Sequence, residues 1–183
     1  MSWYRSATAC SFVVALGALA TAQEMPPPPA PGPAHQVFKE AAGTWDARVE
    51  SFMAPGEPSL STGVEVNRVG CGGLCMISDF KGEFFGASFE GHGTETWDPK
   101  QEKYVGSWTD SMSTGLSLTE STYDAATKTM TGWMEGPDMT GNVAKMRSVS
   151  RLKDADTRIF EMFNTGPDGK EVLGMRITYT RQK

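Results

Sequence analysis

Short runs of alternating apolar and polar residues fill most of the chain. Trp45, Ala47 and Val49, for example, alternate with charged residues. A period of two is typical of a β-strand with one buried face, and helical periodicity is almost absent. The pattern predicts a chain of short strands, preceded by one short helix over residues 35–42 that Gly43 stops.

Other runs show the same period of two. Val64 and Val66 alternate with Glu65 and Asn67. In a later run Ile159, Glu161 and Phe163 oppose Phe160, Met162 and Asn164.

Two segments, 94–108 and 120–133, share one plan. Each has a strand, an aromatic residue, an Asp that opens a turn, a Lys, and a second strand that ends in Trp. Because an Asp side chain can accept hydrogen bonds from the turn that it opens, both segments are predicted to be β-hairpins. Chained hairpins curl with the sheet twist, and closure removes exposed edges. We therefore expect an all-β, antiparallel up-and-down barrel of eight to ten strands over residues 34–183, with a two-sheet sandwich as the alternative.

The first 33 residues do not fit this pattern. Residues 1–22 combine one basic residue, a short apolar run and an Ala-Thr-Ala end, which is typical of a secretory signal peptide. Residues 23–33 contain six of the eleven prolines and are expected to form an extended linker. The expected location is therefore periplasmic or secreted, with no stable membrane insertion after the signal is cleaved.

Composition narrows the function classes. A net charge of −5 argues against nucleic-acid binding, because such proteins usually present a basic surface. Two histidines and scattered acids leave little material for a metal site, and no cofactor is expected. We find no nucleophile elbow, phosphate-binding loop, dinucleotide fingerprint or zinc-protease motif.

The motifs also suggest a family. Gly43-Thr44-Trp45 after a short helix resembles the opening of a lipocalin-type barrel, in which the Trp lies across the closed end. Together with Gly91-His92-Gly93, the segment 103–111 and the ending 179–181, it resembles a bacterial family of exported proteins, domain of unknown function fifteen seventy-nine. This resemblance covers residues 34–183 and implies a lipocalin-like barrel, but no settled activity.

Cys71 and Cys75 are separated by Gly-Gly-Leu. On a straight strand their Cα atoms would lie about 13 Å apart, whereas a disulfide needs about 4.4–6.8 Å. A bond between them is predicted only if the glycines form a turn. A thioredoxin-type redox site is not expected, since the spacing differs from Cys-x-x-Cys.

Large side chains in the strands are the candidates for a ligand-binding cavity. Aromatic and Met side chains can line such a cavity, or they can simply fill the barrel. The predicted lining residues are Trp97, Tyr104, Trp108 and Trp133, with Trp45, Met130, Met134, Met146 and Met162 as further candidates.

Four charged residues join the predicted ligand site. Asp110, Glu161 and Arg147 fall on apolar rows, Arg176 is a possible partner, and a buried carboxylate must be paired or protonated. We therefore predict that Asp110 or Glu161 pairs with Arg147 or Arg176 inside the barrel. His92 is a weaker candidate for a haem or metal ligand and is interpreted as a packed or solvated strand residue.

Three functions remain open. The first is non-enzymatic binding of a small apolar or amphipathic molecule. The second is a small-barrel isomerase or hydrolase that uses an interior carboxylate with Arg147. The third is an interaction scaffold in the cell envelope with a filled barrel. A dry cavity with a charged pair would favour the first function.

Overall fold

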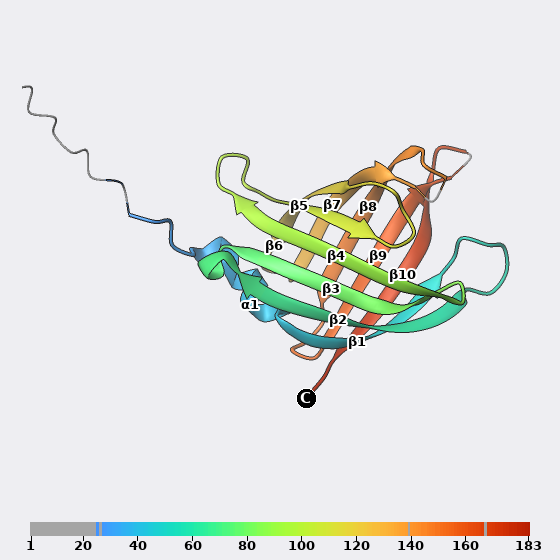
Figure 1. The fold of residues 1–183 in the computed structure, drawn as a ribbon, viewed down its shortest axis with the longest axis horizontal. Helices are drawn as coiled ribbons and strands as arrows, with labels where there is room; N and C mark the ends of the chain where they lie inside the picture. The colour runs from blue at the N-terminus through green and yellow to red at the C-terminus, as the bar shows by residue number, and fades with distance from the viewer. Residues whose placement is uncertain (1–24, 26, 139, 167) are drawn as a thin grey trace, which may run out of the picture.

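The computed structural model describes residues 25, 27–138, 140–166 and 168–183, which form a ten-stranded antiparallel barrel (Figure 1). The strands are β1 (Gly43–Ser51), β2 (Ser59–Gly70), β3 (Cys75–Phe84), β4 (Ala87–Asp98), β5 (Lys103–Asp110), β6 (Ser117–Asp124), β7 (Thr129–Pro137), β8 (Val143–Leu152), β9 (Thr157–Thr165) and β10 (Glu171–Arg181). Each strand pairs with the next along the chain, and β1 pairs with β10 to close the barrel. The barrel prediction is confirmed, and the sandwich alternative is wrong.

The two repeated segments form the predicted hairpins, β4–β5 and β6–β7. Asp98 accepts hydrogen bonds from the backbone N–H groups of the first turn, and Asp124 does the same in the second. Each turn also contains a residue in the left-handed conformation four positions after its Asp. These residues are Glu102 at φ 53° and Lys128 at φ 51°. The repeated sequence therefore encodes a repeated turn geometry.

A short helix closes one end of the barrel, as predicted. A 3₁₀ turn, η1 (Pro33–His35), leads into α1 (Gln36–Ala41), and Phe38 of α1 is almost fully buried. The Trp45 indole Nε1 donates a hydrogen bond of 3.0 Å to the Ala41 carbonyl, so the first strand is tied to this helix. Tyr104 in β5 donates a hydrogen bond of 2.8 Å to the Ala34 carbonyl. We call this the helix end and the opposite end the loop end.

Arg181, at the end of β10, also fixes the helix end. Its guanidinium donates to the carbonyl groups of Ala42 and Glu40 and lies 4.0 Å from the centre of the Trp45 ring. The last strand thus satisfies carbonyl groups that end the helix, which otherwise lack partners. These hydrogen bonds tie the last strand, β10, to the helix that precedes the first strand.

The predicted signal peptide at residues 1–22 lies outside the described residues. The described part of the predicted linker, residues 25 and 27–32, has no helix or strand, and η1 begins at Pro33. Among the described residues, no helix has the length and apolar character needed to cross a membrane.

Candidate functional site

A cavity of about 640 Å³ lies inside the barrel. Methionine and aromatic side chains dominate its wall. The methionines are Met53, Met76, Met112, Met130, Met134, Met146, Met162 and Met175, and the aromatic residues include Phe80, Phe84, Phe89, Trp108 and Phe160. The side chains therefore do not fill the barrel completely, in contrast to the filled-scaffold alternative.

Register explains how the wall is assembled. Inward residues of adjacent strands face each other, as in the pairs Met134↔Met146 and Met162↔Met175. On β4, two glycines lie on the inward row, and the Trp108 ring of β5 packs directly over them. A Cβ atom at Gly91 would come within 2.2 Å of that ring, so the Gly-x-Gly segment makes room for Trp108.

A buried ion pair lies inside the barrel. Arg158 of β9 donates to the Glu65 carboxylate of β2, and the two side chains are only 15% and 9% exposed. Asn67 donates a further hydrogen bond of 2.7 Å to Glu65. Arg158 also lies 4.0 Å from the Tyr179 ring centre and 5.3 Å from that of Trp45. Glu65, Arg158 and Tyr179 all line the cavity.

The protonation of this network follows from its contacts. Burial alone would raise the pKa of Glu65, but attraction to Arg158 and hydrogen bonds from Arg158, Tyr179 and Asn67 outweigh it and lower the pKa. Burial opposes charge on Arg158, but Glu65 raises the pKa of that guanidinium above its ordinary value. Burial and the nearby Glu65 charge raise the pKa of Tyr179. At neutral pH Glu65 and Arg158 are therefore both charged and paired with each other, and the Tyr179 phenol beside them is neutral.

Glu95 of β4 is a second acid on the cavity wall. Its contact is weak, a hydrogen bond of 3.4 Å from the Ser121 hydroxyl. Burial raises the pKa of Glu95 to about 7, and the opposing effects of Ser121 and Arg158 do not cancel it. Near neutral pH the Glu95 carboxyl is therefore protonated in about half of the molecules and ionised in the rest.

Apolar side chains surround the loop end. The large exposed ones at strand ends and loops there are Met53, Leu60, Phe85, Leu116, Leu118, Val143 and Val172. The cavity reaches this end, since the loop residues Met112, Ser113 and Thr140 belong to its wall.

Four of the predicted site residues face inward. Trp108 and Asp110 line the cavity, and the Trp108 indole Nε1 donates to Asp110 Oδ2 at 3.1 Å. Asp110 also accepts hydrogen bonds from the backbone N–H groups of the next loop, so it orders that loop rather than pairing with an arginine. Trp97 and Tyr104 pack beneath Phe38 at the helix end, outside the cavity wall.

The prediction that the other four face inward is wrong. Gly132 and Met134 occupy the inward row of β7, so the Trp133 side chain points outward and is 41% exposed. Ser148 and Met146 take the inward row of β8 in the same way, which places Arg147 outside.

The same alternation holds in β9 and β10, where Glu161 and Arg176 lie on the outer face. They do pair, at 2.7 Å, but not inside the barrel. Arg147 pairs instead with Glu171 at 2.8 Å. Each of these ions is thereby partly hydrated, which avoids the cost of burying a charge.

Sequence reasoning missed Glu65, Glu95 and Arg158. In β2 the local signal points the wrong way, because Val64 and Val66 are more apolar than the inward Glu65. The sequence pattern around Glu95 and Arg158 does indicate an inward position. Glu95 shares its row with Trp97, and Arg158 shares its row with Phe160 and Met162 in the printed sequence.

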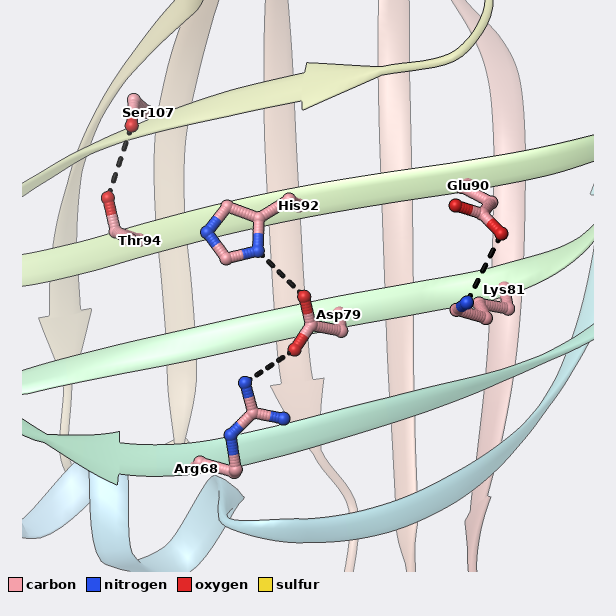
Figure 2. Close-up of polar contacts among 7 residues, drawn as sticks. All are labelled: Arg68, Asp79, Lys81, Glu90, His92, Thr94 and Ser107. Atoms are coloured by element: carbon pink, nitrogen blue, oxygen red, sulfur yellow. Dashed lines mark hydrogen bonds and ion pairs between the residues drawn. The ribbon is translucent and has the colours of Figure 1, made fainter.

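His92 lies on the outer face, so it does not reach the cavity. Its Nδ1 donates a hydrogen bond of 2.7 Å to Asp79 Oδ1, and Arg68 donates one of 2.6 Å to the other carboxylate oxygen (Figure 2). These bonds from His92 and Arg68 lower the pKa of Asp79. Lys81 and Glu90 form a further ion pair across the same strands, so this face is a set of cross-strand contacts.

The predicted disulfide is not formed in this structure. Cys71 and Cys75 are free thiols with their Sγ atoms 2.6 Å apart. The turn that the prediction required is present, as the 3₁₀ turn η2 (Cys71–Gly73) with Gly72 at φ 66°. Burial and the hydrogen bond with Cys71 raise the pKa of the Cys75 thiol to about 11.

Metal-ligating side chains are dispersed in this fold. Within residues 25, 27–138, 140–166 and 168–183, no three His, Cys, Asp or Glu side chains gather into a group that could hold an ion.

Solved structures share this barrel. The crystal structure of Rv2717c from M. tuberculosis is 11% identical, with a TM-score of 0.61 and coverage of 83% of this chain and 99% of that one. The S-type phycobiliprotein lyase CPES from Guillardia theta is 13% identical, with a TM-score of 0.55 and coverage of 82% and 93%. At such low identity both likenesses show the lipocalin-like fold alone.

Sequence comparison gives the family. No curated protein matches the chain significantly. The model of the protein family of unknown function DUF1579 matches residues 30–181, which include the whole barrel and the helix that closes it. The chain belongs to the DUF1579 family.

Proposed function

We propose that the protein is a non-enzymatic binding module that holds a small apolar or amphipathic molecule inside its barrel. The cavity of about 640 Å³ carries this proposal. Its volume lies in the range of about 300–1,000 Å³ found for small-molecule sites, and its wall combines many apolar side chains with a few polar groups. The proposed export of the chain would place this binding activity in the periplasm or outside the cell.

The methionines of the wall suggest what kind of ligand fits. Methionine is unbranched and flexible, so a wall rich in it can adapt to ligands of different outline. Trp108 and the Phe side chains supply larger fixed surfaces. Such a wall favours an elongated or flat apolar body and does not require one unique shape.

The enzymatic alternative has one specific observation in its favour. Glu95 is a carboxyl in a cavity with its pKa raised to about 7, which suits a general base at neutral pH. The arginine that this alternative assigned to the site, Arg147, lies outside, and Arg158 is already engaged by Glu65. Binding is therefore the better supported function, and recovery of a bound ligand in chemically unchanged form distinguishes the two.

Titration with N-phenyl-1-naphthylamine, a neutral apolar dye that fluoresces in dry surroundings, tests the proposal. Ser148 of β8 lines the cavity, so Ser148→Phe inserts a ring into it. Thr131 of the neighbouring β7 is exposed on the outer face, so Thr131→Phe is the matched control. We expect saturable binding by the wild type and by the control, and strongly weakened binding by Ser148→Phe. Equal binding by all three proteins would place the dye elsewhere and contradict the proposal.

A further inference from the structure

We infer that Glu95 selects the ligand, and that the preferred ligands carry an ammonium group or another strong N–H donor at one end of an apolar body. This inference rests on the proposed binding function and specifies its ligand class. It follows from how two buried acids on the wall, Glu65 and Glu95, are partnered.

Glu65 has little capacity left for a ligand. Its carboxylate accepts hydrogen bonds from Arg158 and Asn67 and interacts with the Tyr179 hydroxyl. The positive charge of Arg158 is balanced in the same contact. The two ions therefore cancel, and neither attracts a charged ligand strongly.

Glu95 has the opposite character. Its described contact is the 3.4 Å hydrogen bond from Ser121 on β6, near the upper limit for such a bond. A carboxylate has about four acceptor sites, so most of those of Glu95 remain open toward the cavity. The protein thus surrounds this acid without supplying a direct cationic partner among the described residues.

The strands next to Glu95 also supply no cationic partner for its carboxylate. Glu95 pairs with Met76 of β3 and Gly106 of β5 in the sheet register, and neither carries charge. Burial and the nearby charge of Glu95 raise the pKa of the Tyr104 phenol on β5. Arg158 of β9 acts on Glu95 only through space, without a hydrogen bond.

The other titratable groups on the wall are Tyr123 of β6, Lys128 of the β6–β7 turn and Glu40 of α1 near the helix end, and Glu83, Asp110 and Asp138 toward the loop end. Lys128 and Glu40 approach each other at 3.8 Å. Burial and the charge of Glu40 raise the pKa of the Tyr123 phenol, which keeps it neutral. None of these groups forms an ion pair with Glu95.

A cationic head group would supply what this site lacks. Without it, burial favours the protonated carboxyl, since an unpaired buried anion is costly. An ammonium group beside Glu95 would stabilise the anion and bury its own charge in a paired state. A carboxylate head group would instead meet a site whose net charge is zero or negative.

Three ligands of equal chain length, decylamine, decanol and decanoate, test the inference by displacing N-phenyl-1-naphthylamine at pH 6 and pH 8. An alkylammonium stays charged at both values, because its pKa is near that of Lys at about 10.4. Glu95 is mostly protonated at pH 6 and mostly ionised at pH 8. We expect decylamine to bind most tightly at pH 8 and about tenfold more weakly at pH 6.

Glu95→Gln removes the charge and keeps the shape. We expect this variant to weaken decylamine binding at pH 8 by about 30-fold or more and to leave decanol unchanged. Glu90→Gln is the matched control, because Glu90 lies on the same strand but is exposed and paired with Lys81. The control is expected to retain both the preference and its pH dependence.

The outcomes separate this inference from the proposed function. Equal affinity for the three ligands, or a preference for decanoate, would overturn the role of Glu95 while leaving the binding function intact. Failure of the dye and all three ligands to bind would overturn the binding function itself. If Glu95→Gln does not fold, decylamine binding by the wild type at pH 6 and pH 8 tests the role of Glu95 instead. A preference for decylamine that does not change with pH would contradict the inference.

Discussion

Arg158 donates a hydrogen bond to Glu65 from a strand that is separated from it by β1 and β10 around the barrel wall. The two residues are 93 positions apart in sequence. Their pairing links the second strand to the ninth inside the barrel, so it helps to define how the sheet closes. It also neutralises two charges in the wall of a mostly apolar cavity.

Breaking this pair is expected to destabilise the barrel. Glu65→Gln leaves the Arg158 guanidinium buried without its counter-ion, and such a loss costs about 3–5 kcal/mol. The double variant Glu65→Gln/Arg158→Met is expected to recover much of that stability, because it removes both charges. Urea unfolding followed by tryptophan fluorescence measures the free energies of unfolding.

The outer pair of Glu161 and Arg176 is the matched control. Its side chains are 26% and 39% exposed, against 9% and 15% for Glu65 and Arg158. Because solvent screens such a pair, Glu161→Gln should cost less than about 1 kcal/mol. Similar losses for Glu65→Gln and Glu161→Gln would contradict the distinction between an inner and an outer pair.

Glu95 should make the protein less stable as the pH rises from about 4.5 to about 7. In this window the folded chain holds a proton on Glu95 that the unfolded chain has lost, because burial raises the pKa from 4.5 to about 7. The free energy of unfolding should therefore fall by about 2–3 kcal/mol across the window and level off above it. Glu65 has a lowered pKa, so its stabilisation is lost only as the pH falls further.

Subtracting the pH profile of Glu95→Gln from that of the wild type isolates this effect. The variant should be flatter between pH 4.5 and 7, and more stable than the wild type at pH 8. Parallel profiles for the two proteins would show that Glu95 has an ordinary pKa.

The β3–β4 turn contains backbone strain. Phe85 has φ 52° and is followed by Gly86 at φ 77°, and a left-handed conformation disfavours a bulky residue but suits Asn. Phe85→Asn should raise the free energy of unfolding by about 0.5–1 kcal/mol. Phe85→Ala removes the same ring but keeps the unfavourable backbone preference, so it should be less stable than Phe85→Asn. Equal stability of the two variants in thermal unfolding would exclude strain as the cause.

The two thiols should react in a fixed order. Cys71 is exposed, whereas Cys75 is buried and its pKa is raised to about 11, so little of it is thiolate at pH 8. Brief treatment of the reduced protein with iodoacetamide should modify Cys71 first, as measured by peptide mass spectrometry. Cys71→Ser should then leave a protein that is modified slowly until it is unfolded. Faster labelling of Cys75 would contradict the burial seen here.

The fold could be predicted because its signals are local. The turn residue Asp98, its counterpart Asp124 and the Gly43-Thr44-Trp45 opening each fix a geometry within a few residues. Consecutive hairpins then leave few ways to arrange the strands. The Gly91-His92-Gly93 motif was recognised as a family feature, but its cause, space for Trp108, depends on the neighbouring strand.

The site was less predictable because it depends on register. Alternation tells which residues share a face, but not which face is inside when both rows carry apolar residues, as in β9. Glu161 and Arg158 lie on opposite rows of that strand, and only pairing with β10 decides between them. In β2 the pairing of Glu65 with Trp45 overrides the local preference of the two valines.

Native mass spectrometry of the protein isolated from its source cells tests ligand binding by the hollow barrel most directly. We expect one non-covalent small molecule per chain on the wild type and on Thr131→Phe, and its loss from Ser148→Phe, whose added ring occupies the cavity. A bare chain in all three proteins, even after incubation with a small-molecule extract of the same cells, would contradict the account.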